Sequence, residues 1–188
     1  CALPIYCGSD FVYSKFSTSD HQSVIVDNKL IWVSRSYPAG KYIIPNGVTH
    51  IGSYAFGYHK EVISITIPES VESFSSHPFI GVNKISAFYG KYTTADNRAV
   101  IKDDVLYGVA TNGITKYTVP EGVKSITYRM FRECGLEEIT LPESLEKVGD
   151  NQFEDARTLK TIYCKAIVPP AADDDLFLDA TNISKIYV

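Results

Sequence analysis

The stretch IPNGVTHIGSYAF, residues 44–56, decides the fold, because three more segments repeat its pattern without gaps. They are IPESVESFSSHPF (67–79), VPEGVKSITYRMF (119–131) and LPESLEKVGDNQF (141–153). Each begins with an aliphatic residue, then Pro, Asn or Glu, Gly or Ser, and Val or Leu, and each ends on a Phe that lies 11 residues after the Pro. Self-similarity at a fixed period is the sequence signature of a repeat array.

A second signature follows each segment, with apolar residues at its first, fourth and sixth positions. It reads VISITI (62–67), VNKISA (82–87), LEEITL (136–141) and LKTIYC (159–164). This is the core pattern of a leucine-rich repeat, and successive prolines lie 23 residues apart (Pro45 to Pro68) or 22 apart (Pro120 to Pro142). Because side chains alternate along a strand, positions 4 and 6 are predicted to face the core and positions 3 and 5 to face outward.

Two longer segments interrupt the repeats and resemble each other at an offset of 76 residues. FSTSDHQSVIVDNKLIWV (16–33) aligns with YTTADNRAVIKDDVLYGV (92–109). In each, apolar runs flank a turn-forming pair, Asp27-Asn28 or Asp103-Asp104, which predicts a β-hairpin. The tail 166–188 keeps two prolines, a Phe and a final strand signature at altered spacing, as expected of a terminal repeat that has lost one neighbour.

The expected fold is a β-rich solenoid of the α/β class. It is predicted to be a right-handed leucine-rich-repeat array with inserted β-hairpins and short helical or irregular connections. The whole chain, 1–188, is expected to be a single solenoid. Its predicted parts are a partial repeat plus the first hairpin insert (1–43), two repeats (44–87), the second hairpin insert (88–118), two repeats (119–165) and an atypical C-terminal repeat (166–188).

The composition argues against several classes of function. The net charge of -4 and the pI near 5.6 disfavour nucleic acid as a partner, since binding to its backbone needs a basic face. No apolar run reaches the roughly 20 residues that a transmembrane helix needs. No cofactor is implied, because the sequence has no Gly-rich phosphate loop and no G-x-S-x-G motif. Asp173-Asp174-Asp175 and the sequon at Asn182 are interpreted as ordinary loop sequence.

Cysteine and histidine do not form a metal-site pattern either, because the sequence has no C-x-x-C pair and no Cys-His cluster. The cysteines are interpreted as buried thiols, with a Cys1–Cys7 loop as an alternative, and the histidines as ordinary surface residues. Cys1 is either the lipidated cysteine of a lipoprotein or a fragment boundary; the apolar residues after it favour the second interpretation. The two sets are Cys1, Cys7, Cys134 and Cys164, and His21, His50, His59 and His77.

Taken together, the repeated unit, the LxxIxLP strand, the inserted hairpins and the late CKAxxPP stretch (164–170) resemble the BspA-like leucine-rich-repeat surface proteins. The resemblance covers roughly residues 10–188. It implies a secreted or cell-surface bacterial protein, and several relatives are adhesins for matrix proteins or host cells. The chain departs from the classical leucine-rich consensus, which has Asn or Cys where Ser144 stands. Phe74 and Pro78 replace the usual Ile and Ala, which predicts a local distortion.

The outward strand positions are the candidate binding face, because solenoids bind through such extended surfaces. A plain solvated sheet is the alternative for each residue. Position 3 supplies Ser64, Lys84, Lys116, Glu138, Thr161 and Lys185, and position 5 supplies Thr66, Ser86, Thr118, Thr140, Tyr163 and Tyr187. The candidate contacts from the inserts are Trp32, Tyr37 and Tyr107.

The sequence therefore predicts an extracellular or cell-surface interaction and adhesion module rather than an enzyme. Its expected ligand is a host or matrix protein or a glycan, bound through the sheet face and the inserts, and the expected state is a monomer. The alternative is a structural spacer that projects another domain from the cell envelope.

Overall fold

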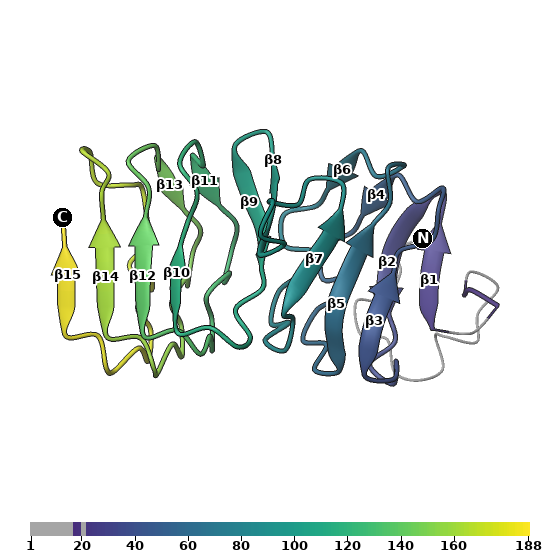
Figure 1. Cartoon of the computed structure of the whole chain (residues 1–188), viewed down its shortest axis with the longest axis horizontal. Helices are drawn as coiled ribbons and strands as arrows, with labels where there is room; N and C mark the ends of the chain where they lie inside the picture. Colours follow the sequence, from purple (N-terminus) through teal and green to yellow (C-terminus); the bar gives the residue numbers. More distant parts are fainter. Residues whose placement is uncertain (1–16, 20–21) are drawn as a thin grey trace.

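A computed structural model describes residues 17–19 and 22–188, so Cys1, Cys7 and His21 lie outside the described residues. The chain winds as a β-solenoid whose strands stand side by side along the long axis (Figure 1). The two sheets nearest the viewer form the front face. They contain β3 (Gly40–Ile43), β5 (Val62–Ile67) and β7 (Ala87–Gly90), and then β10 (Lys116–Thr118), β12 (Glu138–Leu141), β14 (Thr161–Cys164) and β15 (Lys185–Tyr187).

Two further sheets of mostly short strands form the opposite side of the solenoid. The first contains β1 (Ser23–Val26), β2 (Lys29–Val33), β4 (His50–Ile51) and β6 (Ser73–Phe74). The second contains β8 (Ala99–Lys102), β9 (Val105–Val109), β11 (Ser125–Ile126) and β13 (Lys147–Val148). All strand pairs are parallel except the hairpins β1–β2 and β8–β9. Asp27, Asn28, Asp103 and Asp104 all have positive φ, as the hairpin turns require.

The predicted helical connections and the α/β class are wrong, because the described residues contain no helix and therefore none that crosses a membrane. The long turns carry a left-handed residue two positions after each Phe of the repeat. Left-handed backbone cannot continue a right-handed helix, so each turn ends after a few residues. The residues at this position are Tyr58 (φ 56°), Gly81 (67°), Glu133 (52°), Asp155 (55°) and Asp179 (55°).

The predicted core is confirmed where the four repeats align. Phe56, Phe79, Phe131 and Phe153 are all buried, and the last two rings stack with centroids 5.7 Å apart. Position 4 of the front strand is buried in all four repeats, and position 6 is buried in two of them, as Ile139 and Leu141 of β12 show. Each coil thus contributes one aromatic and several aliphatic side chains to a continuous apolar interior, which is the main stabilising term of such a fold.

The strand frame predicted from the signature VNKISA is wrong. The strand in that repeat is β7, and Phe88, not Ile85, pairs with Ile65 of β5. Both frames place apolar residues at positions 1 and 4, but the observed one buries the large Phe88 ring completely. The counted distance from the repeat Phe is the better guide, because Phe79 and Ile85 are six residues apart, as are Phe56 and Val62.

Serine links neighbouring coils at the position where the classical consensus has Asn or Cys. Ser144 Oγ donates to the carbonyl of Val123 (2.8 Å) and accepts from the amide of Gly122 (2.9 Å). Ser70 makes the equivalent bonds between the first two repeats: its Oγ donates to the carbonyl of Val48 and accepts from the amide of Gly47. The distortion expected near Phe74 is not seen, since β6 keeps a regular parallel register with β4.

Candidate functional site

The outward ladders predicted for the last four front strands are present. Lys116, Glu138, Thr161 and Lys185 pair in register, and Lys116 and Glu138 form an ion pair of 3.1 Å. In the second ladder Thr118, Thr140, Tyr163 and Tyr187 stand side by side. The two tyrosine rings stack with centroids 4.8 Å apart at 8°.

Three predicted face residues do not belong to the exposed ladders. Ser64 is in β5 but buried, with 5 % of its surface exposed. Lys84 and Ser86 precede β7 and are therefore not strand residues, because the predicted frame placed the strand too early in the sequence. Lys84 pairs with Glu61 at 3.5 Å, and Ser86 accepts a hydrogen bond from the Asn112 side chain at 2.9 Å.

The corrected frame extends the second ladder onto β3, β5 and β7, where Ile43, Thr66 and Tyr89 pair in register. Ile43 and Tyr89 were missed, although counting from the repeat Phe would have found the tyrosine. No member of the extended row carries a charge, so we call it the uncharged ladder. It consists of Ile43, Thr66, Tyr89, Thr118, Thr140, Tyr163 and Tyr187.

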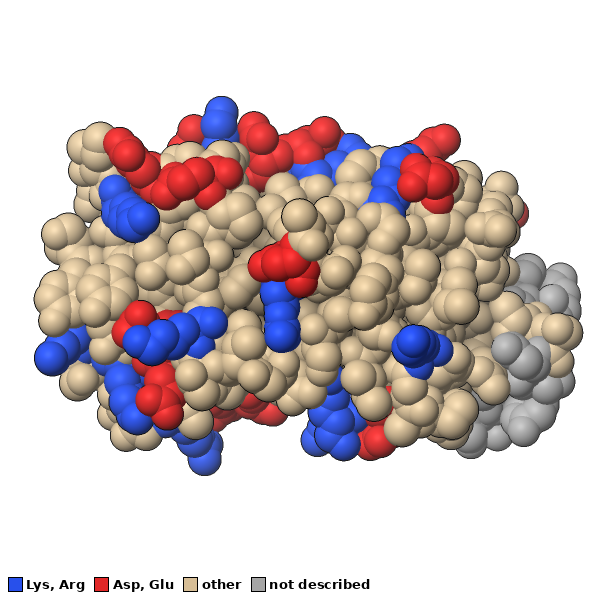
Figure 2. All heavy atoms as spheres, in the orientation of Figure 1, with Lys and Arg blue, Asp and Glu red and all other residues tan. Residues whose placement is uncertain are grey.

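The surface over these strands has little charge. Figure 2 shows a broad uncharged band across the front face, with acidic and basic side chains gathered mostly along its two long edges. Charged groups also interrupt the band between β7 and β10, and further ones lie over the lower part of the face on either side. The face therefore offers hydroxyls, aromatic rings and aliphatic groups rather than a field of one sign.

Two of the three aromatic candidates from the inserts lie on the opposite side of the solenoid, and the third, Tyr37, packs beside β3. Trp32 lies in β2 and Tyr107 in β9, which belong to the opposite sheets. Tyr107 is half-buried and its ring lies 4.8 Å from that of Phe74. The Tyr37 hydroxyl donates to the carbonyl of Lys41 (2.9 Å), and its ring packs against Tyr42. Tyr37 and Tyr107 therefore stabilise the inserts on the core.

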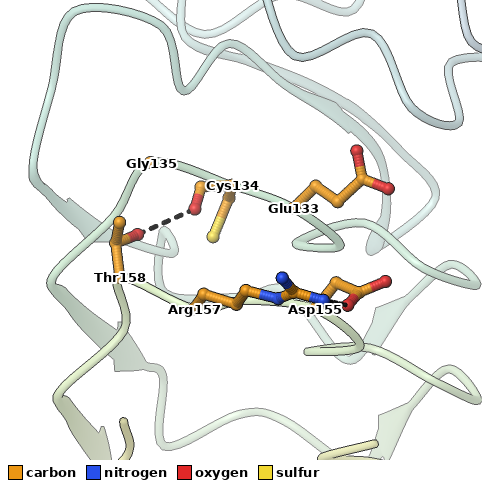
Figure 3. A pocket seen from close by; sticks show the side chains of 6 residues that line it. All are labelled: Glu133, Cys134, Gly135, Asp155, Arg157 and Thr158. Atoms are coloured by element: carbon orange, nitrogen blue, oxygen red, sulfur yellow. Dashed lines mark hydrogen bonds and ion pairs between the residues drawn. The ribbon is translucent and has the colours of Figure 1, made fainter. Parts of the chain in front are cut away.

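A groove runs along the edge where the front strands begin. One depression of about 410 Å³ lies between the turns 133–135 and 155–158, and another of about 290 Å³ lies over 111–115 beside Asn83. Gly135 lines both, so the two depressions adjoin. In Figure 3, Glu133 and Cys134 come from one turn, and Asp155, Arg157 and Thr158 come from the next. Arg157 pairs with Asp155 at 2.9 Å.

Nucleophilic chemistry has no support in this groove. Burial raises the pKa of the Cys134 thiol to about 11, so the thiol stays protonated near neutral pH. Thr158 Oγ1 donates to the carbonyls of Cys134 (2.9 Å) and Leu136 (2.8 Å), which holds the turn in place. Within 17–19 and 22–188, no group of three or more His, Cys, Asp or Glu side chains is arranged to hold a metal ion.

One histidine is not the surface residue that the sequence suggested. His59 is 1 % exposed, its Nε2 lies 2.8 Å from the carbonyl of Ser34, and its Nδ1 accepts from the amides of Glu61 and Val62. These contacts fix the neutral ring with the proton on Nε2. Burial lowers the pKa of His59, so the ring is a structural link between the first insert and the first repeat.

Comparison with known proteins agrees with this architecture. A family model for the BspA type leucine rich repeat region, with six copies, matches residues 35–100 and 99–188. No curated protein matches the sequence.

Solved structures with a similar fold are bacterial leucine-rich-repeat proteins. One from T. pallidum has a TM-score of 0.56 at 18 % identity, with 90 % of this chain and 76 % of that chain covered. One from Eubacterium ventriosum has a TM-score of 0.52 at 17 % identity, covering 80 % and 55 %. A leucine rich cell surface protein from Faecalibacterium prausnitzii has a TM-score of 0.52 at 16 % identity, covering 79 % and 59 %. The chain thus spans little more than half of the last two.

Proposed function

Because this chain belongs to the BspA-type leucine-rich-repeat family, we propose that it is a cell-surface adhesion module that binds a host or matrix protein or glycan through its front face. Leucine-rich-repeat proteins typically serve as protein-interaction modules, and solenoids use their extended sheet surfaces for binding. The similar F. prausnitzii protein is described as a cell surface protein, which supports the proposed location.

The uncharged ladder is the observation that carries this proposal. Its side chains project from hydrogen-bonded parallel strands, so a partner meets a preorganised surface and little backbone entropy is lost on binding. Tyr187 and Tyr89 are 47 % and 41 % exposed, and Ile43 is 69 % exposed. Tyrosines with a wet hydroxyl and an apolar ring are favoured contact residues in protein interfaces.

A solid-phase binding screen of the purified chain tests the proposal. The panel holds extracellular-matrix proteins, host-surface glycans and bacterial envelope polysaccharides. The variant Thr118→Ala/Thr140→Ala/Tyr163→Ala removes the centre of the uncharged ladder, and Trp32→Ala on the opposite side serves as the matched control. We expect saturable binding that the triple variant weakens at least about tenfold, which corresponds to about 1.4 kcal/mol.

Two outcomes would contradict the proposal. Binding that Trp32→Ala abolishes and the triple variant keeps would place recognition on the inserts. A folded chain that binds nothing on the panel would favour a structural spacer that projects another domain from the cell envelope.

A further inference from the structure

We propose that the groove centred on Gly135 is a second binding site, distinct from the front face, and that it takes a neutral oligosaccharide. The groove adjoins the start of the front strands, and each of its two depressions is close to or within the size range of small-molecule sites. The proposal stands whether or not the front face binds a partner.

A shortened turn opens the middle of the groove. In each repeat, a buried residue three positions after the Phe is followed by a short exposed segment and then by the first buried residue of the front-strand signature. In three repeats this exposed segment has two residues: Lys60 and Glu61, Asn83 and Lys84, or Arg157 and Thr158. In the remaining repeat Gly135 alone stands between Cys134 and Leu136, which are both buried. This repeat therefore lacks one residue, and its remaining position has no side chain.

A short coil opens the other end. The hairpin insert passes from β9 to β10 through the six residues 110–115, whereas the regular repeats use ten to twelve residues between a short strand and the next front strand. The longer turns on either side extend past the insert and meet, with the rings of His77 and Tyr128 5.2 Å apart. The space over 111–115 is thus a recess between two turns.

The lining chemistry selects the ligand. The recess is lined by the neutral polar residues Asn83, Asn112, Thr111 and Thr115, and Ile114 is its one aliphatic side chain. Thr111 is buried and Asn112 already donates to Ser86, so Asn83 and Thr115 are the side chains most available to a ligand. Hydroxyl-rich sugars match such amides and hydroxyls. An apolar ligand would leave these polar groups unpaired.

Charge at the other end argues against an acidic ligand. The depression beside Thr158 is lined by Glu133, Asp155 and Arg157. Asp155 pairs with Arg157 at 2.9 Å and with Arg132 at 3.1 Å, and Arg132 also pairs with Glu133. The carboxylates and guanidiniums balance, so an anionic sugar would find no unpaired positive charge there. Extended peptides usually bind through apolar side-chain pockets or along a strand edge. The groove has few apolar side chains, so it offers no clear pocket for a peptide side chain.

Gly135 also gives a direct test. Its φ is not in the left-handed region, and a Cβ built on it meets nothing within 4 Å, so a large side chain enters the groove without disturbing the backbone. Gly135→Trp is the blocking variant. Lys60→Trp, at the aligned turn of the first repeat, is the matched control. Asn83→Ala removes a side-chain amide that lines the recess. Because Asn83 is exposed, this variant is expected to fold, and it tests the site if Gly135→Trp does not fold.

The experiment is a ¹H–¹⁵N NMR titration with cellotetraose, mannotetraose, tetra-N-acetylchitotetraose and sialyllactose, each to about 10 mM so that millimolar binding is detected. We expect saturable shifts of the Gly113 and Gly135 amides with at least one neutral sugar. Binding should weaken at least tenfold in Gly135→Trp and stay unchanged in Lys60→Trp. A preference for sialyllactose, an unaffected blocking variant, shifts confined to Thr118 and Thr140, or no saturable shift with any neutral sugar would each overturn the proposal.

Discussion

Phe153 tests how far the stability of this chain depends on the stacked Phe column. Its ring is 1 % exposed and lies between Phe131 (5.7 Å, 10°) and Phe177 (5.5 Å, 12°). Truncation to Ala removes a fully buried ring and leaves a cavity between two coils, so Phe153→Ala should cost about 3–5 kcal/mol. Part of that loss is the two aromatic contacts, worth about 0.5–1.5 kcal/mol each.

Phe177 is the matched comparison because it occupies the same column but is 38 % exposed. Its ring has one aromatic neighbour instead of two, so Phe177→Ala should cost about 1–2.5 kcal/mol. Guanidinium chloride denaturation followed by circular dichroism measures both values, with the slope of the transition compared among the variants. If the two substitutions cost the same free energy of unfolding, coil-to-coil stacking of Phe does not contribute to the stability of the core.

Three further predictions concern the turns. Ser144→Ala removes both bonds between neighbouring coils and should lower the free energy of unfolding by about 1–2 kcal/mol in denaturant titration. Gly81→Ala should lower the melting temperature, because φ is +67° and the new Cβ would lie 2.5 Å from Cδ1 of Tyr58. Stability should fall as the pH drops below about 6.5, since His59 is neutral when folded with a lowered pKa and the unfolded chain takes up the proton first.

Each of these predictions has its own control. Ser76→Ala, at an exposed serine, should leave the free energy of unfolding nearly unchanged. A Gly113→Ala variant has a similar φ but open space around the new Cβ, so it should cost less than Gly81→Ala. His59→Gln should flatten the loss of stability between about pH 7.5 and 5.5. An equally steep loss in that variant would attribute the pH dependence to the other histidines.

The sequence predicted the repeat, the hairpins and most of the core, because each rests on a local pattern that the fold repeats. The Pro-to-Phe spacing identified the buried column, and the Asp-Asn and Asp-Asp pairs identified turns that need positive φ. The frame of β7 was missed because Ile85 fits two alternating patterns and only the packing of Phe88 distinguishes them.

The helical connections were wrong for a different reason. Tyr58 and Glu133 adopt left-handed backbone, and neither residue type signals it in the sequence. The burial of Ser64 likewise depends on packing between neighbouring coils. The groove had a readable signal, namely that Phe131 and Leu136 are five residues apart while the other repeats use six, but its volume depends on how far the neighbouring turns extend.

Hydroxyl-radical footprinting of the chain bound to its strongest ligand from the binding screen tests the proposed front-face function most directly. The method reports side-chain exposure, and tyrosine and tryptophan react readily. We predict that Tyr89, Tyr163 and Tyr187 on the uncharged ladder lose reactivity in the complex, while Trp32 on the opposite side keeps it. Protection of Trp32 with unchanged tyrosines on the ladder would contradict the assignment of the front face as the binding surface.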